Sequence, residues 1–203
     1  MEPQHQHPAT VDPDLAPRQR IVQAAILLIA EHGFSGVSMT TLAKAAGVSR
    51  QTVYNNFADV DSVVAAAVND HNAEALKQLD TSLRLCPTAV DQLVHFARHF
   101  ADLGAHGHGQ QFEHGLSAGT RTQLAAYEEA IDDRIRSTLL DGVASGEFRT
   151  DVDPATDPVL IHGLLKGAQA AAFQRPDEAA LIAQTAARTA LKALARQESR
   201  SGD

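Results

Sequence analysis

The chain has 203 residues and lacks several features, each of which marks a class of protein. Cys86 is its one cysteine, so an internal disulfide is impossible, as is typical of proteins in a reducing compartment. No apolar run reaches the length of about 18 residues that a membrane-spanning helix needs. Residues 1–17 lack the basic start and the apolar centre of a signal peptide. We therefore expect a cytoplasmic protein without a membrane span.

Positive charge is also scarce, which argues against a protein that is basic over its whole surface. There are 17 basic and 25 acidic residues, and the formal net charge is −8. The charge is uneven, because residues 18–57 hold four basic residues against one acidic residue, a local charge of +3. A basic patch on an acidic protein is compatible with DNA binding. The five charged residues are Arg18, Arg20, Glu31, Lys44 and Arg50.

The alternation of polar and apolar residues that marks a half-buried strand is missing, whereas alanine, a strong helix former, is abundant. Apolar residues recur at helical spacing across residues 18–32, and Gly33 ends that segment. The same reasoning predicts one long helix over residues 120–146 and a later helix that begins at Asp153 and Pro154. We predict an all-α fold.

Residues 48–57, VSRQTVYNNF, carry many hydrogen-bonding side chains between few apolar ones. Ser49 is the predicted N-cap of a short helix, and Ser38 is the predicted N-cap of the short helix before it. Gly47 suits the turn between them, because glycine adopts positive φ without strain. Two short helices joined in this way form a helix-turn-helix arrangement.

The second of these short helices has the polar face expected of a recognition helix. When Val48 and Val53 pack inward, Arg50, Gln51 and Asn55 point outward. Their amide and guanidinium groups match the donors and acceptors that base edges present in the major groove. The alternative interpretation is an ordinary surface helix whose polar residues are only solvated.

A longer pattern runs through residues 18–64: a basic residue, an apolar helix, Gly-Phe, a threonine-rich helix start, Ala-Gly-Val-Ser, Thr-x-Tyr and a phenylalanine. The residues that fit it are Arg18, Gly33, Phe34, Thr40, Thr41, Ala46, Gly47, Val48, Ser49, Thr52, Val53, Tyr54 and Phe57. With them, this segment resembles the DNA-binding domain of the tetracycline-repressor (TetR) family of bacterial transcription regulators. The resemblance covers about a quarter of the chain, and the remainder matches only in helical architecture.

This resemblance implies a homodimer that binds a palindromic operator as a repressor and leaves the DNA when a small molecule binds the larger domain. It also implies contacts with DNA, which we expect to involve phosphates at Thr41, Thr52 and Tyr54 and bases at Arg50, Gln51 and Asn55. The full set of expected DNA contacts is Arg18, Thr40, Thr41, Ser49, Arg50, Gln51, Thr52, Tyr54 and Asn55.

One position departs from the family pattern. The family often has a lysine three residues after the phenylalanine, where it contacts a phosphate, but this chain has Val60 between Asp59 and Asp61. We therefore expect DNA binding that is weaker or more sensitive to salt, unless Arg18 and Arg20 compensate.

The resemblance and the helical pattern together suggest four parts of the chain. An N-terminal three-helix helix-turn-helix domain is followed by a helical domain for effector binding and dimerisation, and short disordered segments flank them. The parts are a disordered arm at 1–16, a DNA-binding domain at 17–62, an effector and dimerisation domain at 63–198, and a disordered tail at 199–203.

Two stripes of small or apolar residues near the end of the chain are expected at the dimer interface. Two such helices from each subunit can form a four-helix interface, as the resemblance suggests. The alternative is that both stripes pack inside one subunit. The first stripe is Gly163, Gly167 and Ala171, and the second is Ala183, Ala187, Leu191 and Leu194.

Aromatic residues and histidines in the middle of the chain are the candidate contacts of the effector. Effector pockets are mostly apolar with a few polar groups, although each of these residues is equally suited to a plain core. The candidates are Phe96, His99, Phe112, His114 and Tyr127.

A metal-sensing regulator is an alternative, because His95 and His99 lie four residues apart and can share one helix face. The region has no further cysteine ligand, however, and we predict neither a bound metal nor another cofactor. The sequence has no P-loop, nucleophile elbow or dinucleotide fingerprint, so we predict that the chain is not an enzyme. The expected partners are double-stranded operator DNA, a small molecule of unknown identity and a second copy of the chain. A helical adaptor for another protein is the remaining alternative.

Overall fold

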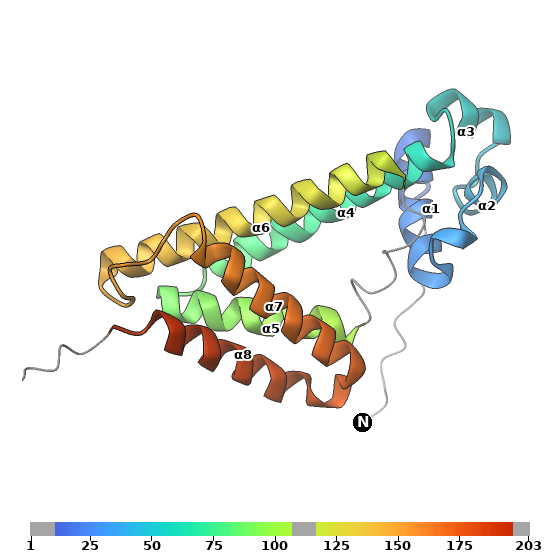
Figure 1. Cartoon of the computed structure of the whole chain (residues 1–203). Helices are drawn as coiled ribbons and strands as arrows, with labels where there is room; N and C mark the ends of the chain where they lie inside the picture. Colours follow the sequence, from blue (N-terminus) through green and yellow to red (C-terminus); the bar gives the residue numbers. More distant parts are fainter. Residues whose placement is uncertain (1–10, 107–116, 197–203) are drawn as a thin grey trace, which may run out of the picture. The chain divides into compact units, whose positions relative to one another are not determined.

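The computed structural model describes residues 11–106 and 117–196. Within these ranges the chain forms eight α-helices and two short 3-10 helices, without a strand (Figure 1). This confirms the predicted all-α fold. Among the described helices, none is both long and apolar enough to cross a membrane. The predicted tail at 199–203 lies outside the described residues.

The chain divides into two compact units, and each is described by itself. The division passes through two long helices rather than through a linker. The predicted domain boundary at residue 62 therefore stays a prediction. The first unit comprises Met1–Ala75 and Gly115–Ala126, and the second comprises Leu76–His114 and Tyr127–Asp203.

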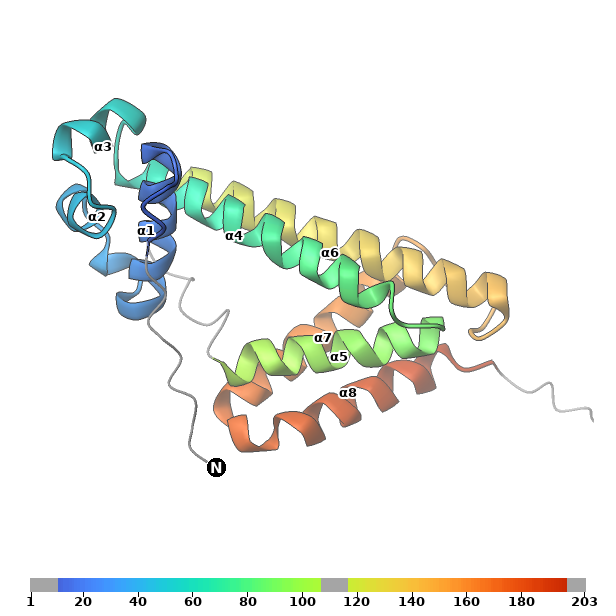
Figure 2. The same cartoon turned by 180° about the vertical axis from the view of Figure 1, so that it is seen from behind.

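Three short helices dominate the first unit: α1 (Pro17–His32), α2 (Met39–Ala45) and α3 (Arg50–Asn56) (Figure 2). A 3-10 helix at Phe34–Gly36 follows α1. Gly33 ends α1 with a φ of 69°, as the sequence predicts.

Both predicted serine caps are confirmed. The Ser38 hydroxyl accepts a hydrogen bond from the Thr41 N–H at 3.1 Å, and the Ser49 hydroxyl accepts one from the Thr52 N–H at 3.0 Å. Gly47 lies between the two helices with a φ of 62°, where a side chain would be strained. These local hydrogen bonds start α2 and α3 at the predicted residues.

The three helices surround a small apolar core of their own. Ile21 of α1, Leu42 of α2 and Val53 of α3 are fully buried in it, and Phe57 closes it. Because the core takes one face of α3, the opposite face stays exposed. The packing therefore supports the helix-turn-helix arrangement.

The structure describes the predicted arm at 1–16 only from Val11 onward. Val11 packs against the core of the first unit, and the Asp12 N–H donates to the Gln23 side chain at 2.8 Å. The arm thus lies against α1 from Val11 onward, because Gln23 and Arg20 supply hydrogen-bond partners that local sequence does not reveal.

Two long helices contribute to both units: α4 (Val60–Leu83) and α6 (Ala118–Ser145). Asp59 caps α4, because its carboxylate accepts from the Ser62 N–H at 2.7 Å. Gly146 follows α6 with a φ of 80°, which confirms the predicted end of that helix.

The second unit also contains α5 (Ala89–Ala105), α7 (Asp157–Gln174) and α8 (Ala179–Leu194), and α5 packs against the other two (Figures 1 and 2). Gly104 permits the close approach of α5 and α7, because a Cβ there would collide with the backbone carbonyl oxygen of Gln169. The packed helices enclose the larger of the two main cores.

The predicted start of α7 at Asp153 and Pro154 is wrong. The Asp153 carboxylate instead accepts from the Ala155 N–H at 2.9 Å and closes a turn. The helix begins at Asp157, with Pro158 in its first turn. A proline is favourable in the first turn of a helix, and because both Pro154 and Pro158 meet this condition, the proline pattern does not decide between the two starts. A similar 3-10 turn at Pro176–Glu178 precedes α8.

Candidate nucleic-acid interface and effector site

The exposed face of α3 is the candidate nucleic-acid interface. Arg50, Gln51, Tyr54 and Asn55 are exposed on it, while Val53 is fully buried beneath them. Tyr54 is 55% exposed, which leaves its ring and hydroxyl accessible to a partner. This face therefore offers guanidinium, amide and phenol groups at the surface.

Hydrogen bonds along this face order its side chains before any ligand is bound. The side-chain Nε2 of Gln51 donates to the side-chain Oδ1 of Asn55 at 2.9 Å, and the Arg50 guanidinium donates to the Thr40 hydroxyl. The Gln51 carbonyl oxygen and the Asn55 NH₂ group keep unused capacity, so the pair still presents an acceptor and a donor. That combination matches the edge of an adenine in the major groove.

Three of the predicted DNA contacts have a structural role. The Thr41 hydroxyl accepts from the Ser38 N–H at 2.8 Å and donates to the Gly36 carbonyl oxygen at 3.0 Å. The Ser49 and Thr52 hydroxyls lie 2.8 Å apart at the start of α3. These hydroxyl groups are committed to the helix caps, which makes them weaker candidates for phosphate contacts than Thr40, Arg18 and Tyr54. 

The two arginines at the start of α1 differ in what they contact. Arg18 is exposed, and its guanidinium lies over the Phe57 ring at 5.0 Å from the ring centroid. Arg20 points inward and donates to backbone carbonyl oxygens of Pro13 and Gly47. Arg18 is thus available to a phosphate, whereas Arg20 is engaged within the unit.

Val60, where the family often has a lysine, is half-buried and packs against the core of the first unit. The flanking Asp59 and Asp61 are exposed. A carboxylate pair at the start of α4 is favourable to the helix dipole but unfavourable to a nearby phosphate.

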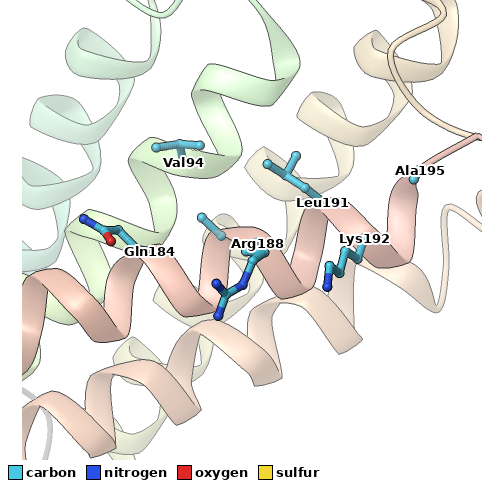
Figure 3. Close-up of a pocket in the computed structure, with 7 residues that line it drawn as sticks. Val94, Gln184, Arg188, Leu191, Lys192 and Ala195 are labelled. Atoms are coloured by element: carbon cyan, nitrogen blue, oxygen red, sulfur yellow. The ribbon is translucent and has the colours of Figure 1, made fainter.

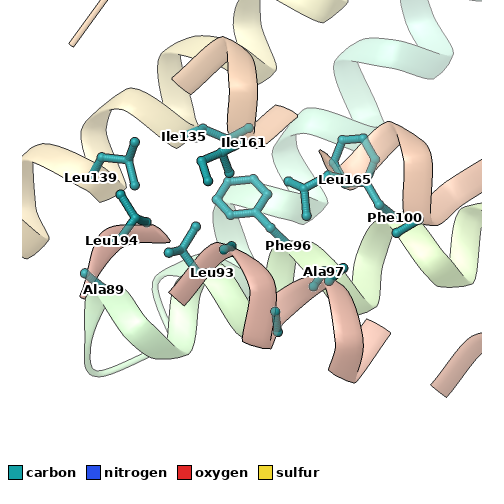
Figure 4. Close-up of a cluster of buried hydrophobic side chains, with 14 of the residues drawn as sticks. Ala89, Leu93, Phe96, Ala97, Phe100, Ile135, Leu139, Ile161, Leu165 and Leu194 are labelled. Atoms are coloured by element: carbon teal, nitrogen blue, oxygen red, sulfur yellow. The ribbon is translucent and has the colours of Figure 1, made fainter. Parts of the chain in front are cut away.

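In the second unit, two predicted effector contacts belong to the core. Phe96 is fully buried, and Figure 4 shows its ring among Ile135, Ile161 and Leu165. Tyr127 is half-buried against the same core, and burial raises the pKa of its hydroxyl. Phe96 packs in the core because α5 turns it toward α6 and α7, and its role as an effector contact stays a prediction. Two of the three remaining candidates, Phe112 and His114, lie outside the described residues.

His99 is the candidate that retains unused polar capacity. Its Nε2 is buried and has no hydrogen-bond partner among the described residues. Burial lowers the pKa of His99, and the positive charge of a protonated His95 lowers it further. The two rings are stacked with centroids 6.5 Å apart. A neutral imidazole with an orphaned ring nitrogen can hydrogen-bond to a ligand.

His162 is a buried residue that the sequence analysis missed. Its Nδ1 lies 2.7 Å from an Asp132 carboxylate oxygen, and its Nε2 lies 3.5 Å from a Glu128 carboxylate oxygen. Phe100 packs edge-on between His162 and His99, with centroid separations of 5.5 and 5.9 Å. No sequence signal marks this cluster, because its partners come from α6 and α7 and lie 30 or more positions apart.

A shallow groove of about 470 Å³ lies between α5 and α8, away from the predicted effector contacts. Figure 3 shows Arg188 and Lys192 extending from one side of α8, with the apolar side chains of Leu191 and Val94 on the other side of that helix. Among the described residues, neither Arg188 nor Lys192 forms an ion pair. None of the predicted effector residues lines this groove.

The structure separates the two stripes that were expected at the dimer interface. Gly163 and Gly167 are exposed on α7, with open space where a Cβ would stand, and Ala171 is half-buried. The second stripe instead packs inside the chain, because α8 turns that face toward α5 and α7. The residues of this inward stripe are Ala183, Ala187, Leu191 and Leu194.

The described residues contain no group of three or more histidine, cysteine, aspartate or glutamate side chains placed to hold a metal ion. His95 and His99 therefore lack a third described ligand. The metal-sensing alternative gains no support from this part of the chain.

Comparisons with known proteins agree with this geometry. Residues 21–67 match the family described as "Bacterial regulatory proteins, tetR family". The fatty acid metabolism regulator protein of Bacillus subtilis is 22% identical over 158 residues, which are 72% of this chain and 78% of that protein. An uncharacterized HTH-type transcriptional regulator of Mycobacterium tuberculosis is 35% identical over 60 residues, which are 30% of this chain and 32% of that protein.

A solved structure shows that the similarity in fold extends over both units. The transcriptional regulator FadR from Bacillus subtilis, crystallised in complex with stearoyl-CoA, superposes with a TM-score of 0.67 at 18% identity. The superposition covers 86% of this chain and 98% of that one. The family match falls on the helix-turn-helix unit and its exposed α3 face. Residues 21–67 form a helix-turn-helix domain of the TetR family, and the chain is a DNA-binding transcriptional regulator.

Proposed function

We propose that this regulator is a homodimeric repressor that binds a palindromic operator through α3 and releases it when a small molecule binds the second unit. The observation that carries the proposal is the exposed face of α3. It presents the side chains of Arg50, Gln51, Tyr54 and Asn55 to solvent. Polar side chains on a rigid, capped helix lose little freedom when they bind base edges.

Within this interface, the side chains have different roles. Arg50 donates to a guanine edge, and the Gln51–Asn55 pair addresses an adenine. Tyr54, Thr40 and Arg18 bind phosphates, which fix the register of the unit on the duplex but carry no sequence information. A change at Arg50 would therefore relax base preference, whereas a change at Arg18 would weaken binding to all sequences.

The exposed face of α7 supports the dimer. Val159 and Leu160 are 53% and 64% exposed, and the small residues Gly163 and Gly167 follow them on the open side of the helix. On α8, Leu181 is 59% exposed. An apolar strip of this kind with glycines that permit close approach suits an isologous helix–helix interface.

The dimer is tested by sedimentation of Leu160→Arg at micromolar concentration. We expect a monomer with weakened operator binding, because a buried arginine would be unpaired at the interface. Leu85→Arg is the matched control, because Leu85 is 81% exposed but lies outside α7 and α8. Sedimentation of both variants as dimers would rule out this face.

The effector site is proposed at His99, because its buried Nε2 has no partner in the part of the chain that the structure describes and a ligand would satisfy it. Long-chain acyl thioesters are the first class to test, since the similar Bacillus subtilis proteins are a fatty acid metabolism regulator and a FadR bound to stearoyl-CoA. A neutral imidazole can donate to a thioester carbonyl oxygen. We expect His99→Leu to keep operator affinity and to raise the effector concentration needed for release about tenfold.

The whole proposal is tested by selecting DNA fragments from the source genome with the purified full chain at two salt concentrations. We expect one or a few palindromic sites, with affinity that falls as salt rises. Addition of acyl-CoA of increasing chain length then tests release. Failure to recover any specific fragment at low salt would contradict the operator-binding role of α3.

A further inference from the structure

We infer that Arg20 is a positioning residue, which holds the turn before α3 in the shape that operator binding requires and does not itself bind a phosphate. The inference rests on the DNA-binding role proposed for α3. It assigns to a basic residue near the interface a function different from the one its charge suggests.

The guanidinium of Arg20 is engaged within the first unit. Nη2 donates to the Gly47 carbonyl oxygen at 3.1 Å, and Nη1 donates to the Pro13 carbonyl oxygen at 3.4 Å. Nε is buried from solvent and has no partner among the described residues. A phosphate contact would require the side chain to give up the Gly47 bond and to turn outward.

The acceptor of this bond is the residue that defines the helix-turn-helix. Gly47 has a φ of 62° and no neighbouring atom within 4 Å of a would-be Cβ. Its own N–H donates to the Lys44 carbonyl oxygen at 3.3 Å, and the next N–H, of Val48, donates to the Ala43 carbonyl oxygen at 3.0 Å. These bonds fasten the turn to α2.

The Arg20 bond fastens the same turn to α1, which is 27 positions away in the chain. Because α3 begins at Arg50, the orientation of the Gly47 peptide plane sets the direction in which α3 leaves the turn. The Val48 N–H, which belongs to the same peptide plane, holds the plane to α2, and the Arg20 bond to the Gly47 carbonyl oxygen holds it to α1. Arg20 therefore restrains the angle between α1 and α3, on which the fit of α3 into a groove depends.

Arg20 also joins the N-terminal segment to the turn. The Pro13 carbonyl oxygen accepts from the same guanidinium, and the Asp12 N–H donates to Gln23 one turn further along α1. Gln23 holds this segment, and no hydrogen bond joins it to Gly47 among the described residues. It therefore offers a control that loosens the segment but leaves the turn intact.

The experiment measures the affinity of the full chain for its selected operator and for unrelated DNA, each over a range of salt. The variants are Arg20→Gln, Arg20→Lys and Gln23→Ala, and thermal melting of each confirms that it is folded at the assay temperature. For Arg20→Gln we expect operator affinity to fall about tenfold, because a charge-assisted hydrogen bond is lost. Affinity for unrelated DNA and the salt dependence of operator binding should stay unchanged. Arg20→Lys should recover part of the loss, since an ammonium group can still donate to the Gly47 carbonyl oxygen.

Each contrary outcome is distinct. If Arg20 binds a phosphate, Arg20→Gln will weaken binding to both kinds of DNA and lower the slope of log affinity against log salt by about 0.9. If Arg20 only stabilises the fold, both affinities will fall together with the folded fraction. Operator affinity equal to that of the unchanged chain would also overturn the inference. A strong effect of Gln23→Ala would assign the role to the N-terminal segment instead. Failure of the unchanged chain to bind any site would contradict the proposed function, not the role of Arg20 within it.

Discussion

The two units of this protein differ in how their candidate functional residues are placed. In the first unit, most of them are exposed on short helices whose ends are fixed by local hydrogen bonds, such as those of Ser38 and Ser49. In the second unit, Phe96 and the stripe that includes Ala187 belong to the core. Local signals thus specify which face of a short helix is exposed, whereas long helices acquire their inner and outer faces from packing.

The chemistry of the two units differs in the same way. The first unit displays groups that already have their hydrogen-bond geometry, as in the Gln51–Asn55 pair. The second unit buries polar groups between helices, where His162 is paired with Asp132 and the His99 Nε2 lacks a hydrogen-bond partner within the described part of the chain. The surface of the first unit therefore suits a large polar partner, whereas the interior of the second unit suits a small ligand.

The largest expected effect tests whether Phe96 is a core residue or a ligand contact. Replacing Phe96 with alanine should lower the free energy of unfolding by about 3–5 kcal/mol, because a fully buried ring leaves a cavity. Urea denaturation measures the loss. Phe96→Leu, which keeps much of the apolar volume, should cost far less. A loss below about 1 kcal/mol for Phe96→Ala would place this residue at a flexible pocket wall instead.

The next effect tests the exposed face of the first unit. Arg50→Glu should weaken operator binding at least about 100-fold, or roughly 2.7 kcal/mol, because it replaces a cation with an anion near phosphates. Arg188→Glu makes the same charge change at an exposed position of the second unit and should leave operator affinity nearly unchanged. Fluorescence anisotropy with labelled operator compares the two. Equal affinities for the two variants would remove Arg50 from the interface.

A smaller effect concerns the acid stability of the second unit. Burial lowers the pKa values of His95 and His99 below the ordinary 6.5, so the unfolded chain binds protons that the folded chain does not. Stability should therefore be complete above pH 7 and fall as the pH drops below about 6.5, by less than about 1.4 kcal/mol per pH unit for each histidine. Urea unfolding of the double variant His95→Gln and His99→Gln at pH 7.5 and 5.5 should show a shallower loss. An identical pH dependence would mean that neither imidazole is held neutral.

The smallest effect tests the departure at Val60. Val60→Lys should raise operator affinity about threefold to tenfold and steepen the salt dependence by about 0.9, because it adds one phosphate contact. A missing phosphate contact weakens binding but makes it less dependent on salt, so the greater salt sensitivity expected from the sequence does not follow from Val60. The methylene groups of lysine can replace the apolar contact that half-buried Val60 makes with the core of the first unit. Anisotropy titrations at three salt concentrations provide both quantities. Asp61→Asn controls for the removal of negative charge without a new contact.

The sequence alone determined the helical class, the helix-turn-helix and most of the helix ends. Ser38, Ser49 and Gly146 act on backbone atoms within a few residues of themselves, so the local sequence is enough to predict their effects. The exposed face of α3 was predicted from equally local information, because a seven-residue helix that buries one side leaves the other side exposed.

Only the tertiary structure decided contacts between residues that are far apart in the chain. Arg20 reaches Gly47, Asp132 reaches His162, and the Glu147 carboxylate accepts from the Val90 N–H at 3.0 Å and helps cap α5. The same contact with the Val90 backbone lowers the pKa of Glu147. Such partners depend on how the helices pack. The spacing of residues along one helix shows which of its faces are apolar, but it does not show which neighbouring helix will cover each face.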